Sequence, residues 1–448
     1  MKALAEQIRL VLADSNAGDL HGLIDPYYPP DLADVMAFLN DEEDLKLFSA
    51  LNVEEAADVL DEVDDCTKEL LARHTPPDRL AQIVHALPTD EGADILEHLP
   101  TEAMEPVLNL LSPEEAKSLR FLLTFPKQSA GGLMSLGFTQ IKETASVEDA
   151  LTAFKATHDV EAIFSIYVVS ETGTLQGVVD LRTLVASDPL RPVRELMIRG
   201  TAWAYPDTDQ EEVARIFARY DLNSLPVISR EPDSRLIGVI TADDVIDVIE
   251  QEATEDILRM AGSDAQEMER TSPSRIALLR LPWIMATMFI ELLAGLVIHF
   301  YDGTLARILL LTSFMPIISA ISGNTGLQSA TIIVRGISAG AIQLTQWHRA
   351  VFRQLTMTAI LGGITGLTLG VIGAIWYGKW TFGLVIFLGM FTAVNIAGVV
   401  GTLVPLTSKR LGFDPAITSG PFETAFQDVV GISIFLTLAT LMLPYLAK

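Results

Sequence analysis

The sequence has little sulfur and little positive charge. It contains one cysteine, and 31 Lys and Arg residues stand against 58 Asp and Glu residues, for a formal net charge of −27 over 448 residues. A lone cysteine excludes a disulfide framework and a thiolate metal cluster. The acidic excess argues against nucleic acid as a partner, because nucleic acid requires a basic surface. It favours cations, and clustered carboxylates suit hard divalent ions.

Acidic residues are themselves scarce in the C-terminal part of the chain. From Ile276 onward nine basic residues stand against five acidic ones, a charge of +4, which leaves −31 for residues 1–275. The mean hydropathy of the whole chain is nevertheless positive, at +0.34. The sequence therefore combines a strongly acidic soluble part with a membrane part, and a single soluble globule is excluded.

Long uncharged runs in the C-terminal part predict five transmembrane helices, since a span needs about 20 apolar residues. We expect the last helix to begin at Pro421. Basic residues gather on one side of the spans, which predicts a cytoplasmic N-terminus and an outside C-terminus for a multi-pass protein of the cell (inner) membrane. The first 20 residues lack the apolar segment of a signal peptide, in agreement with this orientation. The runs are about 281–301, 308–334, 354–378, 380–408 and 429–447.

The acidic part begins with a repeat of about 12 residues, whose copies start at Asn52, Pro88, Pro100 and Ser112. Each copy has a helix-starting residue followed by one apolar stripe, so the repeats predict short helices stacked into an α-superhelix. The register places Asp58 and Asp94 at equivalent positions, with Asp90 one turn before Asp94. These carboxylates form either a solvated face or a cation-binding face.

From Lys142 the pattern changes to alternating helices and strands, and the same order occurs twice. The strands 166–170 and 175–180 correspond to 224–229 and 235–240. This tandem resembles a pair of cystathionine-β-synthase (CBS) domains, which implies a regulatory module that can bind adenine nucleotides such as ATP. The second copy has acidic residues after its last strand, whereas the first has Leu181-Arg182-Thr183, a departure that argues against nucleotide binding in that half.

A long acidic helix, about Asp243 to Met260, connects this region to the spans. Four of its carboxylates fall within an arc of about 140°, at 100° per residue. They are Asp244, Asp247, Glu252 and Glu255. Like charges on one face destabilise a helix. These four carboxylates therefore either form a solvated face or bind a cation.

Polar residues inside the spans are expensive and point to function. Pro316 and two glycines near Asn324 would loosen the second span and free backbone carbonyls. Asp428 lies four residues after Thr424 in the fifth span, where a carboxylate costs about 2.5–3.5 kcal/mol on insertion scales. A hydrated cation would compensate this charge; the alternative is a protonated Asp bonded to a neighbouring span.

Taken together, the membrane motifs resemble the MgtE family of magnesium channels and transporters. The residues that carry the resemblance are Pro316, Gly323-Asn324-x-Gly326-x-Gln328, Asn395-x-x-Gly398, Asp414-Pro-Ala, Ser419-Gly-Pro and Asp428. The resemblance implies a multidomain membrane protein. It has an all-α superhelical N-terminal domain (1–130), α/β tandem CBS domains (131–242), an acidic connecting or plug helix (243–270) and a five-helix transmembrane pore domain (271–448).

The resemblance also implies the ion and the residues that handle it. It identifies Mg²⁺ as both substrate and regulator, with a homodimeric channel that Mg²⁺ closes from the cytoplasm. Asp428 corresponds to the pore carboxylate, assisted by Asn324 and by main-chain oxygen near Thr424, and Asp414 lies at the cytoplasmic mouth. The sensing carboxylates correspond to Asp58, Asp90, Asp94, Glu211, Asp221, Asp244, Asp247, Glu252 and Glu255.

A secondary transporter and an enzyme are the two other classes of function to compare with a channel. A CBS-regulated secondary transporter could couple divalent cations to H⁺ or Na⁺ through Asp428 and Glu291. An enzyme is not expected, because the spans have no nucleophile–base pair and no histidine except His299 and His348 near their ends. No phosphate-binding loop of an ATPase occurs in the sequence.

Overall fold

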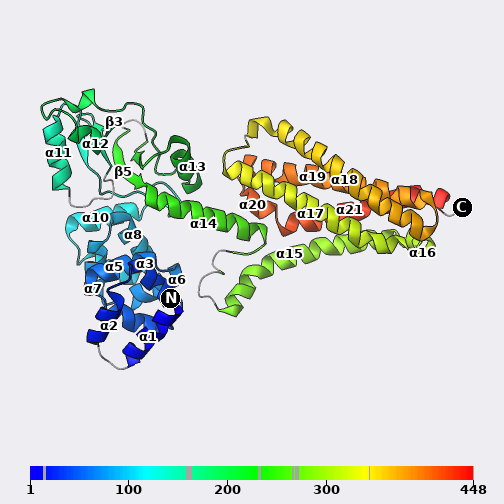
Figure 1. Cartoon of the computed structure of the whole chain (residues 1–448), viewed down its shortest axis with the longest axis horizontal. Helices are drawn as coiled ribbons and strands as arrows, with labels where there is room; N and C mark the ends of the chain where they lie inside the picture. Colours follow the sequence, from blue (N-terminus) through cyan, green and yellow to red (C-terminus); the bar gives the residue numbers. More distant parts are fainter. Residues whose placement is uncertain are drawn as a thin grey trace. The chain divides into compact units, whose positions relative to one another are not determined.

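The computed structural model describes residues 1–13, 17–157, 164–230, 234–264, 267, 272–342 and 344–446. It divides into two compact units, Met1–Gln251 and Glu252–Lys448, which are described separately (Figure 1). The predicted boundary between connecting helix and membrane domain, at 270 and 271, lies outside the described residues. The four-part division predicted from the sequence stays a prediction.

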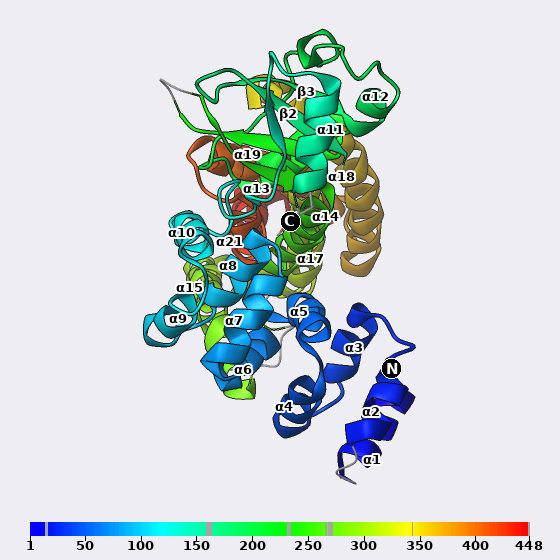
Figure 2. The ribbon, with the colours of Figure 1, turned by 90° about the vertical axis from the view of Figure 1, so that its left-hand side faces the viewer.

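Short helices build the first part of unit Met1–Gln251 (Figure 2). Their apolar faces meet in one core, to which Leu47, Leu60 and Leu96 contribute fully buried side chains. Helices two apart in sequence contact each other, such as α3 with α5 and α5 with α7, as stacked repeats require. The helices are α1 (Lys2–Ala13), α2 (Ala17–Ile24), α3 (Pro29–Met36), α4 (Asp41–Ala50), α5 (Val53–Glu62), α6 (Asp65–His74), α7 (Pro77–Ala86), α8 (Thr89–Glu97), α9 (Thr101–Leu108) and α10 (Pro113–Leu122).

The repeat read from the sequence marks the starts of four of these helices. Asn52, Pro88, Pro100 and Ser112 are the N-cap residues of α5, α8, α9 and α10. The Asn52 side chain accepts a hydrogen bond of 2.9 Å from the Glu55 backbone N–H, which forms a capping box. The predicted superhelix is therefore present, with Asp58 and Asp94 on corresponding faces of α5 and α8.

Two small sheets follow, one for each half of the predicted tandem. In the first, β1 (Gln140–Lys142) pairs parallel with β2 (Ser165–Val169), which pairs antiparallel with β3 (Leu175–Asp180). In the second, β4 (Ser224–Ile228) pairs antiparallel with β5 (Leu236–Thr241). Both antiparallel pairs contain a register shift at the same point, at Val168/Val169 and at Val227/Ile228, which confirms the duplication. The accompanying helices are α11 (Val147–Ala156), α12 (Leu181–Val185), η1 (Val193–Glu195) and α13 (Gln210–Tyr220).

The acidic helix predicted at about Asp243–Met260 is α14 (Ala242–Met260). It follows β5 directly and buries Val245 and Val248, so its N-terminal half is anchored by packing. The boundary between the two units falls within it, after Gln251.

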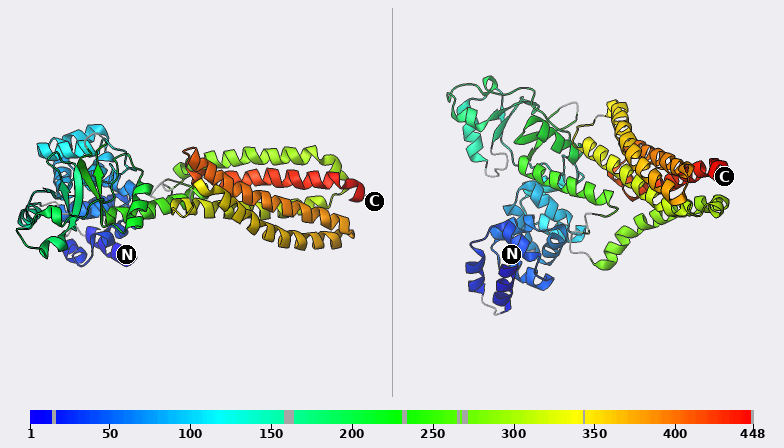
Figure 3. Two further views of the ribbon diagram at one scale, coloured as in Figure 1. Left: turned by 90° about the horizontal axis from the view of Figure 1, so that it is seen from above. Right: turned by 45° about the vertical axis from the view of Figure 1, so that its right-hand side comes forward.

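Unit Glu252–Lys448 consists of long helices, and among the described residues five are long and apolar enough to cross a membrane. Figure 3 shows these helices lying side by side. The number agrees with the sequence prediction, and α21 begins at Pro421 as expected. The helices are α15 (Pro273–Phe300), α16 (Asp302–Arg307), α17 (Leu311–Ser338), η3 (Leu344–Gln346), α18 (Trp347–Tyr377), α19 (Trp380–Arg410), α20 (Pro415–Thr418), α21 (Pro421–Leu441) and α22 (Leu443–Leu446).

The second span is one continuous helix. Pro316 and the nearby glycines lie inside α17, which runs from Leu311 to Ser338, and the predicted loosening of this span stays a prediction. Pro316 lies early in the helix, where the backbone loses one hydrogen bond without breaking the turns that follow.

The glycine stripe of α18 permits close helix packing. A Cβ on Gly366 would lie 3.1 Å from the Phe387 carbonyl oxygen, and one on Gly370 would lie 2.8 Å from the Gly383 carbonyl oxygen. A side chain at either position would push α19 away, so these glycines hold α18 against α19.

Candidate cation sites

The carboxylate predicted to be the pore residue, Asp428, lies two turns into α21 and faces two other helices. Ser319 Oγ of α17 donates a hydrogen bond to Asp428 Oδ1. The Glu291 carboxyl of α15 lies within direct interaction range of the Asp428 carboxyl. α15, α17 and α21 therefore place two carboxyl groups and a hydroxyl together inside the apolar part of the unit.

Gly323 of α17 faces Thr424 and Asp428 of α21. A Cβ on Gly323 of α17 would lie 3.3 Å from Thr424 Cγ2 and 4.0 Å from Asp428 Oδ1. The structure therefore brings Thr424 and Asp428 to one face that meets Gly323, as the i, i+4 spacing predicted. Asn324, the next residue, is exposed on α17, and its assisting role stays a prediction.

A second polar pair in α21 was not identified as a site from the sequence. Glu423 is 1% exposed and Gln427 is fully buried. The signal that could have found them is the same as for Asp428, namely an acidic residue inside a predicted span. Sequence reasoning counted Glu423 only as one of the few acids of this half.

Asp414 lies just before α20 and joins two other charged groups. Its Oδ1 accepts a hydrogen bond of 2.8 Å from the Ala416 backbone N–H, and its Oδ2 forms an ion pair with Arg259 of α14. Arg259 also pairs with Glu255, one turn earlier. Burial raises the pKa of Glu255 above its usual range, while Arg259 acts in the opposite direction. Two predicted carboxylates are thus held together by an arginine that sequence reasoning did not single out.

Several acidic side chains of unit Met1–Gln251 converge on Asp61 of α5. Burial raises the pKa of Asp61, and the neighbouring charges of Asp94 and Asp247 raise it further. Lys68 Nζ, 3.9 Å from Asp61 Oδ1, partly offsets them. The predicted residues Asp58, Asp94 and Asp247 therefore act electrostatically on Asp61, a residue that the sequence did not single out.

A lysine and a histidine offset the negative charge of two aspartates, Asp94 and Asp65. Lys127 Nζ lies 3.7 Å from Asp94 Oδ2 and 3.8 Å from Asp65 Oδ1. His98 Nε2 lies 3.3 Å from Asp65 Oδ1, and this contact lowers the pKa of Asp65 to about 2. Asp90 is buried on α8, one turn before Asp94.

The remaining predicted residues are not gathered at one place. Glu211 lies at the start of α13, whereas Asp221 follows its C-terminal end in a left-handed conformation (φ 50°). Asp244 accepts hydrogen bonds from Thr241, and burial raises its pKa to about 6. Asp247, which acts on Asp61, lies one turn after Asp244, and Glu252 lies farther along α14, in the other unit. These residues stay predictions as metal ligands.

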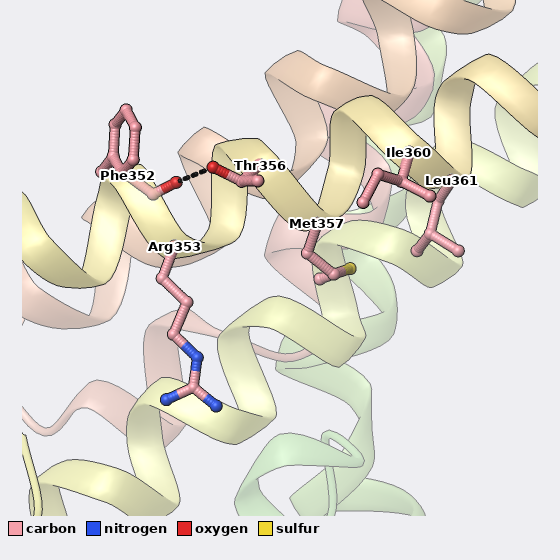
Figure 4. Close-up of a pocket in the computed structure, with 6 residues that line it drawn as sticks. All are labelled: Phe352, Arg353, Thr356, Met357, Ile360 and Leu361. Atoms are coloured by element: carbon pink, nitrogen blue, oxygen red, sulfur yellow. Dashed lines mark hydrogen bonds between the residues drawn. The ribbon is translucent and has the colours of Figure 1, made fainter.

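The described residues do not form a compact metal site. Among the described residues, no group of three or more His, Cys, Asp or Glu side chains is placed to hold a metal ion. A surface hollow of about 440 Å³ lies along α18 (Figure 4). Its lining has one charged side chain, Arg353, and otherwise consists of Phe352, Thr356, Met357, Ile360 and Leu361, which does not suit a cation.

Comparison with known proteins identifies the family. Residues 315–438 match the MgtE family model, described as a divalent cation transporter, residues 27–128 match the MgtE intracellular N domain, and residues 130–188 and 193–251 match the CBS domain. The chain is 34% identical to the magnesium transporter MgtE of Thermus thermophilus over 341 residues, 75% of this chain and 74% of that protein. The chain belongs to the MgtE family.

Other MgtE proteins extend the similarity over nearly the full length. The chain is 30% identical to the magnesium transporter MgtE of Bacillus subtilis over 435 residues, 97% of this chain and 96% of that protein. It also resembles the crystal structure of the cytosolic domain of the Mg²⁺ channel MgtE in complex with ATP. The TM-score is 0.51 at 33% identity, with 55% of this chain and 99% of that chain covered. Its helical N domain, CBS pair and apolar helices thus belong to a multi-pass membrane transporter architecture.

Proposed function

We propose that the protein transports Mg²⁺ across the cell membrane through its unit of apolar helices and that its acidic unit, in the cytoplasm, senses Mg²⁺. The observation that carries the proposal is Asp428, a carboxylate inside the helical unit with Ser319 and Glu291 beside it. Mg²⁺ loses water reluctantly and is usually held by one or two carboxylates with several waters retained. In a homodimer, two Asp428 side chains would face a hydrated ion across the axis.

An ion channel is the mode of transport that needs the fewest assumptions. An inside-negative potential of 100 mV drives a divalent ion inward by about 4.6 kcal/mol, at about 2.3 kcal/mol per charge. The sequence has no phosphate-binding loop, so this potential is the proposed driving force.

A secondary transporter is the second candidate, and the Glu291–Asp428 contact favours it. Two carboxyl groups in direct contact can exchange one proton for part of a cation's charge. The mechanism would then couple Mg²⁺ entry to movement of H⁺ or Na⁺.

Flux measurements with liposomes separate the two modes. We expect Mg²⁺ uptake by the full-length protein to follow a K⁺ diffusion potential and to persist when the proton and sodium gradients are zero. Uptake that disappears when either gradient is removed, at constant potential, would establish coupled transport instead.

Gating follows from the carboxylates of the acidic unit. Two carboxylates about 4 Å apart repel by about 1 kcal/mol in water and by several times more near a protein surface. Bound Mg²⁺ would remove this repulsion, compact the acidic unit and favour the closed channel, because the ion binds the compact state more tightly. For the CBS pair, the ATP complex of the related cytosolic domain supports nucleotide binding, and the departure at Leu181-Arg182-Thr183 argues against the first half as its site.

Arg259, near the C-terminal end of α14, forms ion pairs with Glu255 and Asp414. These ion pairs provide a test of how the channel is held closed. The proposed closed state has α14 held against the segment before α20, and Arg259→Gln would weaken that contact. A partly exposed pair contributes about 0.2–1 kcal/mol, so Mg²⁺ flux at millimolar Mg²⁺ should rise by up to about fivefold. The exposed residue Arg275 provides the matched control, Arg275→Gln. Equal flux in wild type and Arg259→Gln at all Mg²⁺ concentrations would remove Arg259 from the closure mechanism.

A further inference from the structure

Glu423 and Gln427 form a buried polar pair that the transport mechanism above does not use. They lie one turn apart on the same face of α21, 1% exposed and fully buried respectively. The Gln427 amide acts weakly on the Glu423 carboxylate, but among the described residues neither carboxylate oxygen of Glu423 and neither amide atom of Gln427 has a partner at hydrogen-bond distance. Four unpaired polar atoms in one turn of a buried helix face require an explanation, because buried polar groups are normally paired.

The neighbouring helices are shaped around this pair. A Cβ on Gly326 of α17 would overlap the Glu423 carboxylate, so the carboxylate rests directly against the α17 backbone. A Cβ on Gly401 of α19 would in turn overlap the Gly326 backbone, so α19 packs directly against α17 at this residue. Gly326 therefore makes room for the Glu423 side chain, and Gly401 lets α19 approach α17 at the same point.

The hydroxyl groups of the adjoining helices do not serve the pair. Thr325 Oγ1 donates to the Ile321 carbonyl oxygen, Ser329 Oγ to the Thr325 carbonyl oxygen, and Thr402 Oγ1 to the Gly398 carbonyl oxygen. Each hydroxyl proton is thus committed to its own helix. An ionised carboxylate enclosed in this way would be strongly unfavourable unless a bound cation compensated its charge.

The neighbouring charge that acts on Glu423 is negative. Asp428 acts electrostatically on Glu423 from the next turn of α21. The nearest basic residues in the two facing helices are Arg335, nine positions from Gly326 in α17, and Lys409, eight positions from Gly401 in α19. Carboxylate and amide oxygens are the ligands that hard divalent cations take in proteins.

We propose that Glu423 and Gln427 form a second binding site for the transported divalent cation, adjacent to Asp428 and nearer the start of α21. The ion passes between Asp428 and this site, which supplies the several weak positions that conduction requires. The proposal rests on the proposed function, because it takes Asp428 as the first site.

Bound Mn²⁺, measured by electron paramagnetic resonance on the full-length protein, tests the second site as a substitute for Mg²⁺. Glu423→Gln should bind one Mn²⁺ fewer per chain than wild type and should lower Mg²⁺ flux about tenfold, the loss expected for about 1.4 kcal/mol. Glu195→Gln, at an exposed glutamate of the CBS region, is the matched control and should leave both values unchanged. A gain variant, Gln427→Glu, adds a second carboxylate and should tighten Mn²⁺ binding while slowing flux.

The outcomes distinguish a cation site from a neutral acid. If Glu423 is simply protonated, the amide of Glu423→Gln replaces it in shape and charge, and unchanged Mn²⁺ count and flux would overturn the proposal. If Glu423→Gln does not fold, unaltered Mn²⁺ affinity in Gln427→Glu would overturn it equally. Wild-type flux in Asp428→Asn would refute the proposed function itself. Loss of flux in Asp428→Asn together with wild-type behaviour of Glu423→Gln would refute the second site alone.

Discussion

Asp428→Ala is expected to abolish Mg²⁺ uptake into liposomes, to the level of liposomes without protein. Asp428 is the carboxylate that Ser319 orients and that faces Gly323, so its removal leaves the ion without an anionic ligand in the apolar unit. A divalent ion at that depth without a counter-charge would face a barrier of several kcal/mol, which stops flux on the timescale of the assay. The measurement is uptake reported by an enclosed Mg²⁺-sensitive dye under a K⁺ diffusion potential.

Two controls make this result specific. Asp302→Ala removes an exposed acid of the same unit and should transport as wild type does. Asp428→Asn keeps the size of the side chain and its ability to accept from Ser319, so its failure would isolate the charge as the required property. Normal uptake by Asp428→Ala would remove Asp428 from the ion pathway.

Millimolar Mg²⁺ is expected to protect residues 1–260 of the full-length protein from protease. The largest effect is expected at cleavage sites in the segment that joins the helical repeats to α14. The acidic side chains around Asp61 repel one another, and a bound cation would remove that repulsion and compact the unit. The measurement is the rate of limited proteolysis from zero to millimolar Mg²⁺, followed by identification of the fragments.

Asp61→Asn tests whether that group of carboxylates is responsible. One charge fewer should increase protection without Mg²⁺ and reduce the additional protection that Mg²⁺ provides. The exposed Asp25 lies outside the group, and Asp25→Asn should respond to Mg²⁺ as wild type does. Cleavage of the wild-type protein that is independent of Mg²⁺ would refute the sensor.

Local sequence signals predicted most of the architecture. Apolar runs predicted the five membrane helices, and the repeat predicted the starts of α5, α8, α9 and α10, because each signal resides in a few adjacent residues. The same reasoning located Asp428, since a carboxylate in an apolar helix is visible without knowing its neighbours. The effect of Pro316 could not be read in the same way, because the effect of a proline depends on the turn of the helix that it occupies.

Local sequence signals did not predict the contacts between helices. Arg259 pairs with Asp414, 155 positions later, and Asp61 lies near Asp247 from a different helix. No periodicity links these residues, because their approach depends on how α14 and its neighbours pack. Glu423 is the clearest case. In the sequence it is one more acidic residue, and only the packing of α21 against Gly326 of α17 shows that its carboxylate is enclosed.

The order of the residues alone establishes that this protein has an acidic part of charge −31 and an apolar part of charge +4, and it places carboxylates at equivalent positions of the repeats. Charge, hydropathy and helical phase are properties of consecutive residues, so they need no fold to be read. The packing of the helices sets which carboxylates interact: Asp428 with Glu291, Asp61 with Asp94 and Asp247, and Glu255 with Asp414 through Arg259. Electrostatic interaction depends on distance through space, and that distance is set by the packing of helices remote in sequence.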